Sequence, residues 1–112
     1  MSLEDLFSEL CMIGIPVVYQ EFPENQNPNY IAFFEDRADG ISADGVTIAV
    51  VSHIEIHLIT QKRDNLLENQ IEKILDKYHV GLHKEIKWYP KHKYFDTAYV
   101  FETLEAKELE ES

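Results

Sequence analysis

The chain has 112 residues, of which 45% are hydrophobic and 28% charged, so its length and composition are those of one globular domain and not of a disordered segment. Its formal net charge of −11 disfavours binding to nucleic-acid phosphates and to acidic membrane surfaces, both of which would repel it. The single cysteine excludes an internal disulfide, and no apolar stretch approaches the roughly 20 residues that a membrane-spanning helix needs.

The first elements predicted along the chain are a helix and a short strand. Apolar residues recur at three- and four-residue spacing over 3–13, which predicts an amphipathic helix that ends at Gly14. Cys11 lies near this apolar stripe and is expected to be buried. Strand-forming residues follow over 17–22, and residues 23–29 then form a loop rich in proline and asparagine.

Two further strands are predicted in the middle of the chain, on either side of a polar segment. Residues 30–35 are apolar on both faces, which is typical of a strand inside a sheet. Residues 36–45 contain two glycines and four charged residues, and we interpret them as a loop. Residues 46–60 form a long strand whose second half alternates apolar and polar residues, as in a sheet with one face in water.

The C-terminal half predicts a second helix and two strands. An apolar stripe over 65–79 indicates the helix, with Asn65 and Glu68 as a capping box at its start. Strand patterns follow over 83–89 and 94–104, joined by a turn that contains a proline.

The predicted order is therefore αβββαββ, and the fold class is α+β. Short connections between neighbouring strands favour antiparallel pairing, so we expect an antiparallel sheet of about five strands. Each helix has a single apolar stripe, which places both helices on one face of the sheet. Residues 1–104 are expected to form a single domain, and residues 105–112 an acidic C-terminal tail.

The side chains that could support catalysis or bind a metal are scattered. His53 and His57 lie four apart on a predicted strand, so they share a face but are about 13 Å apart, too far to share one ion. No nucleophile elbow, phosphate-binding glycine loop or dinucleotide fingerprint is present. We therefore expect a protein that is not an enzyme and has no cofactor and no metal. The alternatives are an enzyme that uses loop carboxylates and a regulatory domain that binds a small ligand.

One segment, residues 83–93, has a local excess of positive charge and two large aromatic residues. Such a segment can stack on single-stranded nucleic acid or can dock onto protein, and the acidity of the whole chain favours docking. The candidate subunit-interface residues are Lys84, Lys87, Trp88, Tyr89, Lys91 and Lys93.

Several short blocks of the sequence resemble one known family. In their order and spacing they resemble the tail terminator, or tail completion, proteins of long-tailed bacteriophages and prophages, over roughly residues 10–104. The blocks are Val18–Pro23, Pro28–Phe33, Ser42–Val46, His53–Asp64 with the following helix from Leu67 to Leu75, and Tyr94–Leu104.

This resemblance implies a small domain that assembles as a homo-oligomeric ring, typically a hexamer. The ring would stop elongation of the tail tube protein and offer a docking surface to the head connector protein, while DNA passes through it without specific binding. The resemblance also implies that the chain has no catalytic residues. It implies a place in the virion tail, reached after assembly in the host cytoplasm. Another protein of the head–tail neck is the nearest alternative.

The interfaces of such a ring can be predicted from charge. A ring needs two different patches that complement each other, and residues 1–61 have ten acidic groups against Arg37. We therefore expect the basic segment of one subunit to meet acidic residues of its neighbour. Loops often become ordered on binding, so the two polar loops are expected to contact the tube or the connector. The candidate docking residues are Glu24, Asn25, Asn27, Asp36, Arg37, Asp39 and Asp44.

Overall fold

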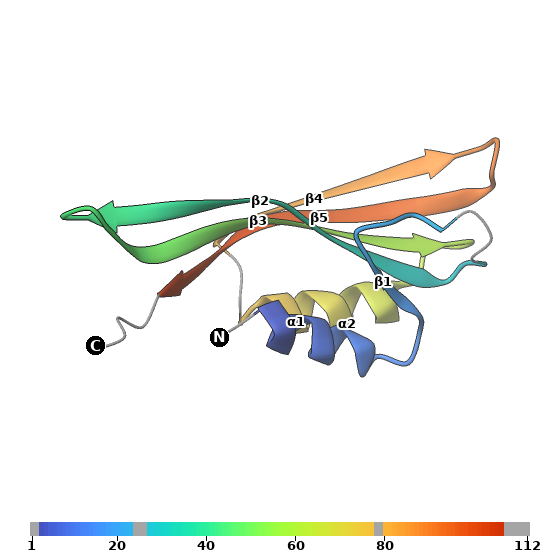
Figure 1. The fold of residues 1–112 in the computed structure, drawn as a ribbon. Coiled ribbons are helices and arrows are strands. Elements are labelled where there is room, and N and C mark those ends of the chain that lie inside the picture. Colours follow the sequence, from blue (N-terminus) through green and yellow to red (C-terminus); the bar gives the residue numbers. More distant parts are fainter. Residues whose placement is uncertain (1–2, 24–26, 78–79, 107–112) are drawn as a thin grey trace.

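The computed structural model describes residues 3–23, 27–77 and 80–106, which form a five-stranded sheet with two helices on one of its faces (Figure 1). This arrangement confirms the α+β class and the predicted element order. Neither described helix is long and apolar enough to cross a membrane. The elements are α1 (Leu3–Cys11), β1 (Val17–Tyr19), β2 (Tyr30–Ala43), β3 (Val46–Thr60), α2 (Asn65–Leu75), β4 (Val80–Tyr89) and β5 (Tyr94–Ala106).

The strands lie in the order β1-β2-β3-β5-β4, so that β3 is central and β1 and β4 form the two edges. Three of the four neighbouring pairs are antiparallel, as predicted. The pair β1–β2 is parallel, with Val17 opposite Ile31, so at this edge the sheet differs from the antiparallel one expected. Strand β5 continues to Ala106, two residues into the segment expected to be a tail.

The prediction of a loop over 36–45 was wrong, because β2 and β3 form one long hairpin there. Only Asp44 and Gly45 form its turn, and both have positive φ angles, 51° and 77°. Positive φ at both central residues is typical of the tight turn whose twist matches that of the flanking strands. The register shifts between Glu35 and Arg37, where one extra residue bulges from β2. Pairing with β3 holds this polar segment extended despite its weak strand propensity.

The core lies between the helices and the sheet face that they cover. Four apolar side chains of the two helices are fully buried, and burial of each contributes about 1.5–3 kcal/mol of hydrophobic stabilisation; they are Leu6, Leu10, Ile71 and Leu75. Helix α2 is shorter than predicted. Its N-cap is Asp64, whose side chain accepts a hydrogen bond from the Leu67 amide at 3.1 Å. The predicted capping box at Asn65 and Glu68 was therefore wrong. The central buried side chains are Leu6, Leu10, Ile31, Phe33, Ile54, Ile56, Leu58, Ile71, Leu75, Tyr99 and Phe101.

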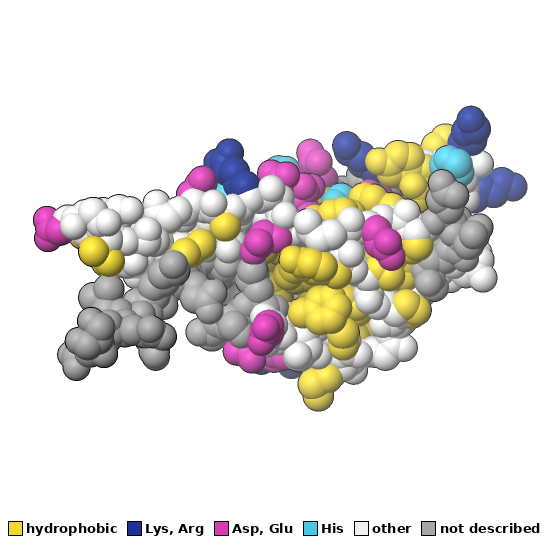
Figure 2. All heavy atoms as spheres, viewed as in Figure 1, with side chains coloured by type: hydrophobic (Ala, Val, Ile, Leu, Met, Phe, Trp, Pro, Cys, Tyr) yellow, Lys and Arg dark blue, Asp and Glu magenta, His cyan; other side chains and the backbone are white. Residues whose placement is uncertain are grey.

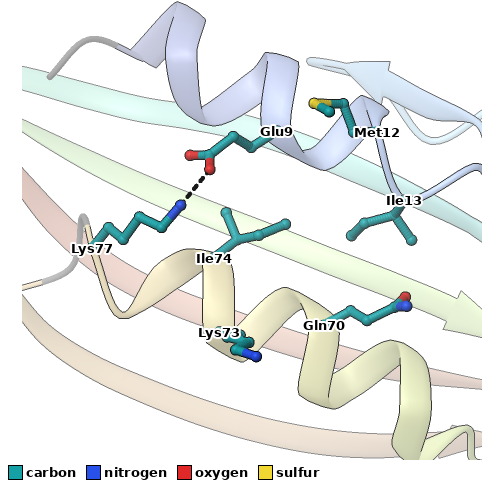
Figure 3. Close-up of a pocket in the computed structure, with 7 residues that line it drawn as sticks. All are labelled: Glu9, Met12, Ile13, Gln70, Lys73, Ile74 and Lys77. Atoms are coloured by element: carbon teal, nitrogen blue, oxygen red, sulfur yellow. Dashed lines mark hydrogen bonds and ion pairs between the residues drawn. The ribbon is translucent and has the colours of Figure 1, made fainter.

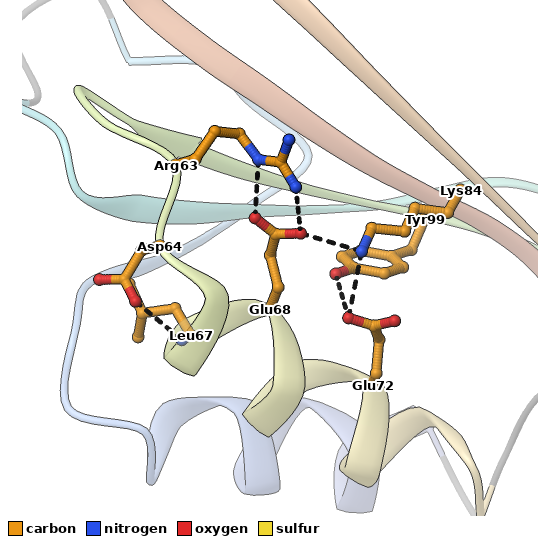
Figure 4. A network of polar contacts seen from close by, with 7 residues as sticks. All are labelled: Arg63, Asp64, Leu67, Glu68, Glu72, Lys84 and Tyr99. Carbon is orange, nitrogen blue, oxygen red and sulfur yellow. Dashed lines mark hydrogen bonds and ion pairs between the residues drawn. The ribbon is translucent and has the colours of Figure 1, made fainter.

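Beneath the sheet, Glu68 is buried in a network of polar contacts (Figure 4), with a side chain that is only 3% exposed. Arg63 donates two hydrogen bonds to its carboxylate, both at 3.0 Å, and the Lys84 ammonium lies 2.9 Å away. Lys84 also contacts Glu72 at 3.2 Å, and the Tyr99 hydroxyl donates to Glu72 at 3.1 Å. Burial raises the pKa of Glu68, but the bonds from Arg63 and Lys84 outweigh it and hold the pKa below its ordinary value. The network therefore ties α2 to the edge strand β4 and to β5.

Candidate assembly surfaces

The hairpin of β4 and β5 ends in an aromatic and basic surface, residues 86–95, which we call the tip. The Trp88 and Phe95 rings pack together with centroids 4.6 Å apart, and Trp88 remains 47% exposed. Tyr89 and Tyr94 form a second ring pair, with centroids 5.0 Å apart. Figure 2 shows Lys and Arg atoms beside hydrophobic atoms at this end of the molecule.

The structure separates the six residues predicted for the subunit interface. Lys84 is not on the tip, because its ammonium is engaged within the subunit by Glu68 and Glu72. Lys84 and Lys87 are an odd number of residues apart on β4, so they point to opposite faces of the sheet. The other five residues are gathered at the tip: Lys87, Trp88, Tyr89, Lys91 and Lys93.

At the other end of the sheet the hairpin of β2 and β3 projects past both helices (Figure 1). We call this hairpin, residues 36–51, the arm. Three of its large apolar side chains are exposed: Ile41 at 43%, Val46 at 49% and Ile48 at 39%. The arm is thus a narrow β-ribbon with hydrophobic side chains in water, and Figure 2 shows such atoms along its lower side. Exposed apolar groups that gather on one element are typical of a contact surface.

The predicted docking residues are located mainly on this arm, although on a strand and not in a loop. Asp36, Arg37 and Asp39 belong to β2, and Asp44 is at the hairpin turn. Asn27 is exposed in the connection that precedes β2. Residues 24 and 25, the predicted Glu24 and Asn25 contacts, lie outside the described residues.

The sheet face opposite the helices carries His53 and His57, the two histidines of β3 whose spacing was predicted to be too wide for one ion. His57 Nδ1 lies 2.9 Å from Asp96 Oδ1, and its Nε2 lies 3.5 Å from Glu55. Asp96 is diagonal to His57 across the β3–β5 pair, since its direct partner is Ile59. This neighbour relation depends on strand register, which the sequence does not reveal.

His53 has a similar environment further along β3. Its Nε2 lies 3.0 Å from Asp39 of the arm and its Nδ1 lies 3.2 Å from Glu102 of β5. Each histidine therefore bridges two carboxylates across neighbouring positions of the sheet. Among the residues that the structure describes, no group of three or more histidine, cysteine or acidic side chains is arranged to hold a metal ion.

The charge of His57 can be tested directly. Burial lowers its pKa, but the hydrogen bond to Asp96 and the nearby Glu55 carboxylate outweigh burial, so the pKa lies above the ordinary 6.5. We expect Asp96→Asn to lower the pKa of His57 in an NMR titration, while Asp44→Asn, at the far end of the arm, leaves it unchanged. The stabilisation from this charge is complete below about pH 6.5 and is lost as the pH rises through the raised pKa of the folded protein. A wild-type His57 that titrates below 6.5 would contradict this account.

Two grooves lie beside α1. One, of about 400 Å³, runs between α1 and α2, and the ion pair of Glu9 and Lys77 closes one end of it at 2.6 Å (Figure 3). The other, of about 560 Å³, is lined by residues that include Phe7 and Tyr19. The prediction that Cys11 is buried was wrong: it is exposed at the end of α1, because it follows the buried Leu10 directly and so points away from the core.

No protein-family model matches the sequence, and no curated protein matches it. The fold is similar to that of a chain in a solved structure described as the virion of a native gene transfer agent particle, with a TM-score of 0.60. The match covers 88% of this chain and 84% of the other, at 15% sequence identity. The two chains therefore share a fold over most of their lengths.

Proposed function

We propose that this chain is a structural protein of a phage-like virion and acts as a tail terminator. In this role, copies of the chain form a ring that ends the tail tube and joins it to the head connector, and DNA passes through the ring. The observation that carries the proposal is the fold shared with a chain of a virion particle over 88% of this chain and 84% of the other. The ordered sequence blocks that resemble tail terminators support the same role.

The surfaces of the domain also support assembly more than chemistry. Its exposed aromatic and aliphatic side chains lie at the tip and on the arm, where they can be buried against other proteins. On the open sheet face His53 and His57 are each engaged by two carboxylates, which satisfies their ring nitrogens. The net charge of −11 would repel the DNA phosphates and let the duplex move past without sticking. The proposed role is therefore not enzymatic.

The proposal predicts what happens when the protein is absent. In the virion system that encodes the chain, deleting its gene should give tail tubes of uncontrolled length that carry no heads, and supplying the protein should restore tubes of uniform length. Electron microscopy of the particles measures both properties. Tubes of normal length that fail to join heads would indicate another neck protein, and normal virions without the chain would reject a structural role.

A further inference from the structure

We infer that the subunits of the ring join end to end, with the arm of one copy seated on the tip of the next. This inference rests on the proposed ring and names the surfaces that build it. The arm and the tip lie at opposite ends of a molecule whose longest extent is 53 Å (Figure 1). They differ from each other, so the contact is heterologous, which is the type that generates rings.

The two ends carry opposite charge. The arm contains three aspartates and Arg37, a net charge of −2. The tip contains three lysines and no acidic residue, a net charge of +3 with its histidine neutral. Two carboxylates flank the tip: Asp96 is engaged by His57, and Glu85 lies 3.7 Å from His83, both within the subunit. Opposite charges on two surfaces steer their encounter and fix their register, while two copies of the same end repel each other.

Both ends also expose apolar side chains to water. Ile41 and Val46 represent the arm, and at the tip Ile86 is 40% exposed beside Trp88 at 47%. A tryptophan on a rigid strand, packed against Phe95, is a favoured interface anchor. Neither α1 nor α2 covers the arm, so a second copy would supply there the cover that the helices give to the rest of the sheet.

Charge reversal at each end tests the contact. The tip variant is Lys87→Glu with Lys91→Glu, which leaves Lys93 in its positive-φ turn position. The arm variant is Asp36→Lys with Ser42→Lys and Asp44→Asn, which keeps an asparagine-glycine turn. We expect wild-type self-association, measured by analytical ultracentrifugation at low salt, to weaken at least tenfold in each variant alone. An equimolar mixture of the two should recover it, because each reversed end then meets an end of opposite charge.

The matched control reverses two lysines outside both ends, Lys62→Glu and Lys73→Glu, and should associate like the wild type. Circular dichroism confirms that each variant is folded. Variants that associate as well as the wild type, or a mixture that does not recover, would overturn the inference. A product that stops at a two-fold dimer would also overturn the inference. In such a dimer each arm lies on the other copy, so no arm or tip is left free to extend the assembly into a ring.

A chemical trap covers the case in which the isolated wild type is monomeric. In a Cys11→Ser background, a mixture of the Ile41→Cys and Ile86→Cys chains should form disulfide-linked dimers under oxidation. A control mixture of Ile41→Cys with Leu66→Cys, on an exposed position of α2, should not. No excess over the control overturns the inference. If the charge-reversal variants associate as well as the wild type while deletion of the gene still gives tubes of uncontrolled length, only the inference fails; if the trap succeeds but tube length is never controlled, only the proposed function fails.

Discussion

Replacing Arg63 and Lys84 together by alanine is expected to lower the free energy of unfolding by about 3–5 kcal/mol, the usual cost of leaving a buried charge without its partner. The Glu68 side chain is only 3% exposed, and its carboxylate receives its ion-pair contacts from these two side chains. Without them, burial raises the pKa of Glu68, so the carboxyl group must either stay charged and unpaired or take up a proton. Urea denaturation at neutral pH measures the loss.

The control for this prediction adds Glu68→Gln to the double variant. The neutral amide removes the buried charge, so the triple variant should be more stable than the double one at neutral pH, although it has one more substitution. The stability deficit of the double variant should also shrink as the pH falls and Glu68 is protonated. In the wild type the same protonation removes stability, because the paired carboxylate has a lowered pKa. A triple variant that is less stable than the double variant would show that the network contributes through packing and not through charge.

Replacing Phe33 by alanine is expected to lower the free energy of unfolding by about 3–5 kcal/mol, because a large core side chain and the contacts around it are lost. Phe33 is 1% exposed, and its ring lies 5.9 Å from that of Phe7 on α1 and 5.7 Å from that of Tyr19 on β1. The substitution therefore also loosens the attachment of both N-terminal elements to the sheet.

Phe22→Ala is the matched control. Phe22 also packs against another ring, that of Phe34 at 4.8 Å, but it is 50% exposed on the open face of the sheet. We expect it to lower the free energy of unfolding by less than about 1.5 kcal/mol, since water already reaches half of the side chain. A loss for Phe33→Ala as small as that for Phe22→Ala would mean that the N-terminal elements do not depend on Phe33 for their packing.

Patterns within a single element were enough to predict most of the fold. The alternation of Ile54, Ile56 and Leu58 identified the buried face of β3, and the stripe of α1 identified its contact with the sheet. What failed was the interpretation of residues 36–45 as a loop, because a ribbon that faces water on both sides has no apolar alternation to reveal it.

The tip could be predicted because its lysines and aromatic residues are neighbours in the sequence. The polar contacts could not, because they join residues that only the register of the sheet brings together. His57 and Asp96 are 39 positions apart, and Lys84 reaches Glu72 from another element. A buried glutamate such as Glu68 also has no signature of its own, since its position near a helix start is equally typical of a capping residue.

Because β1 is short, part of the sheet edge of an unassembled subunit stays unpaired. β1 pairs with β2 only over Ile31–Phe33, and from Asp36 to Ala43 the outer edge of β2 has no neighbouring strand among the described residues. Unpaired backbone groups of this kind can template stacking with strands from other chains. The bulge beside Arg37 and the charges around it interrupt the regular edge that such stacking requires. The irregularities of the arm therefore also act against uncontrolled aggregation before assembly.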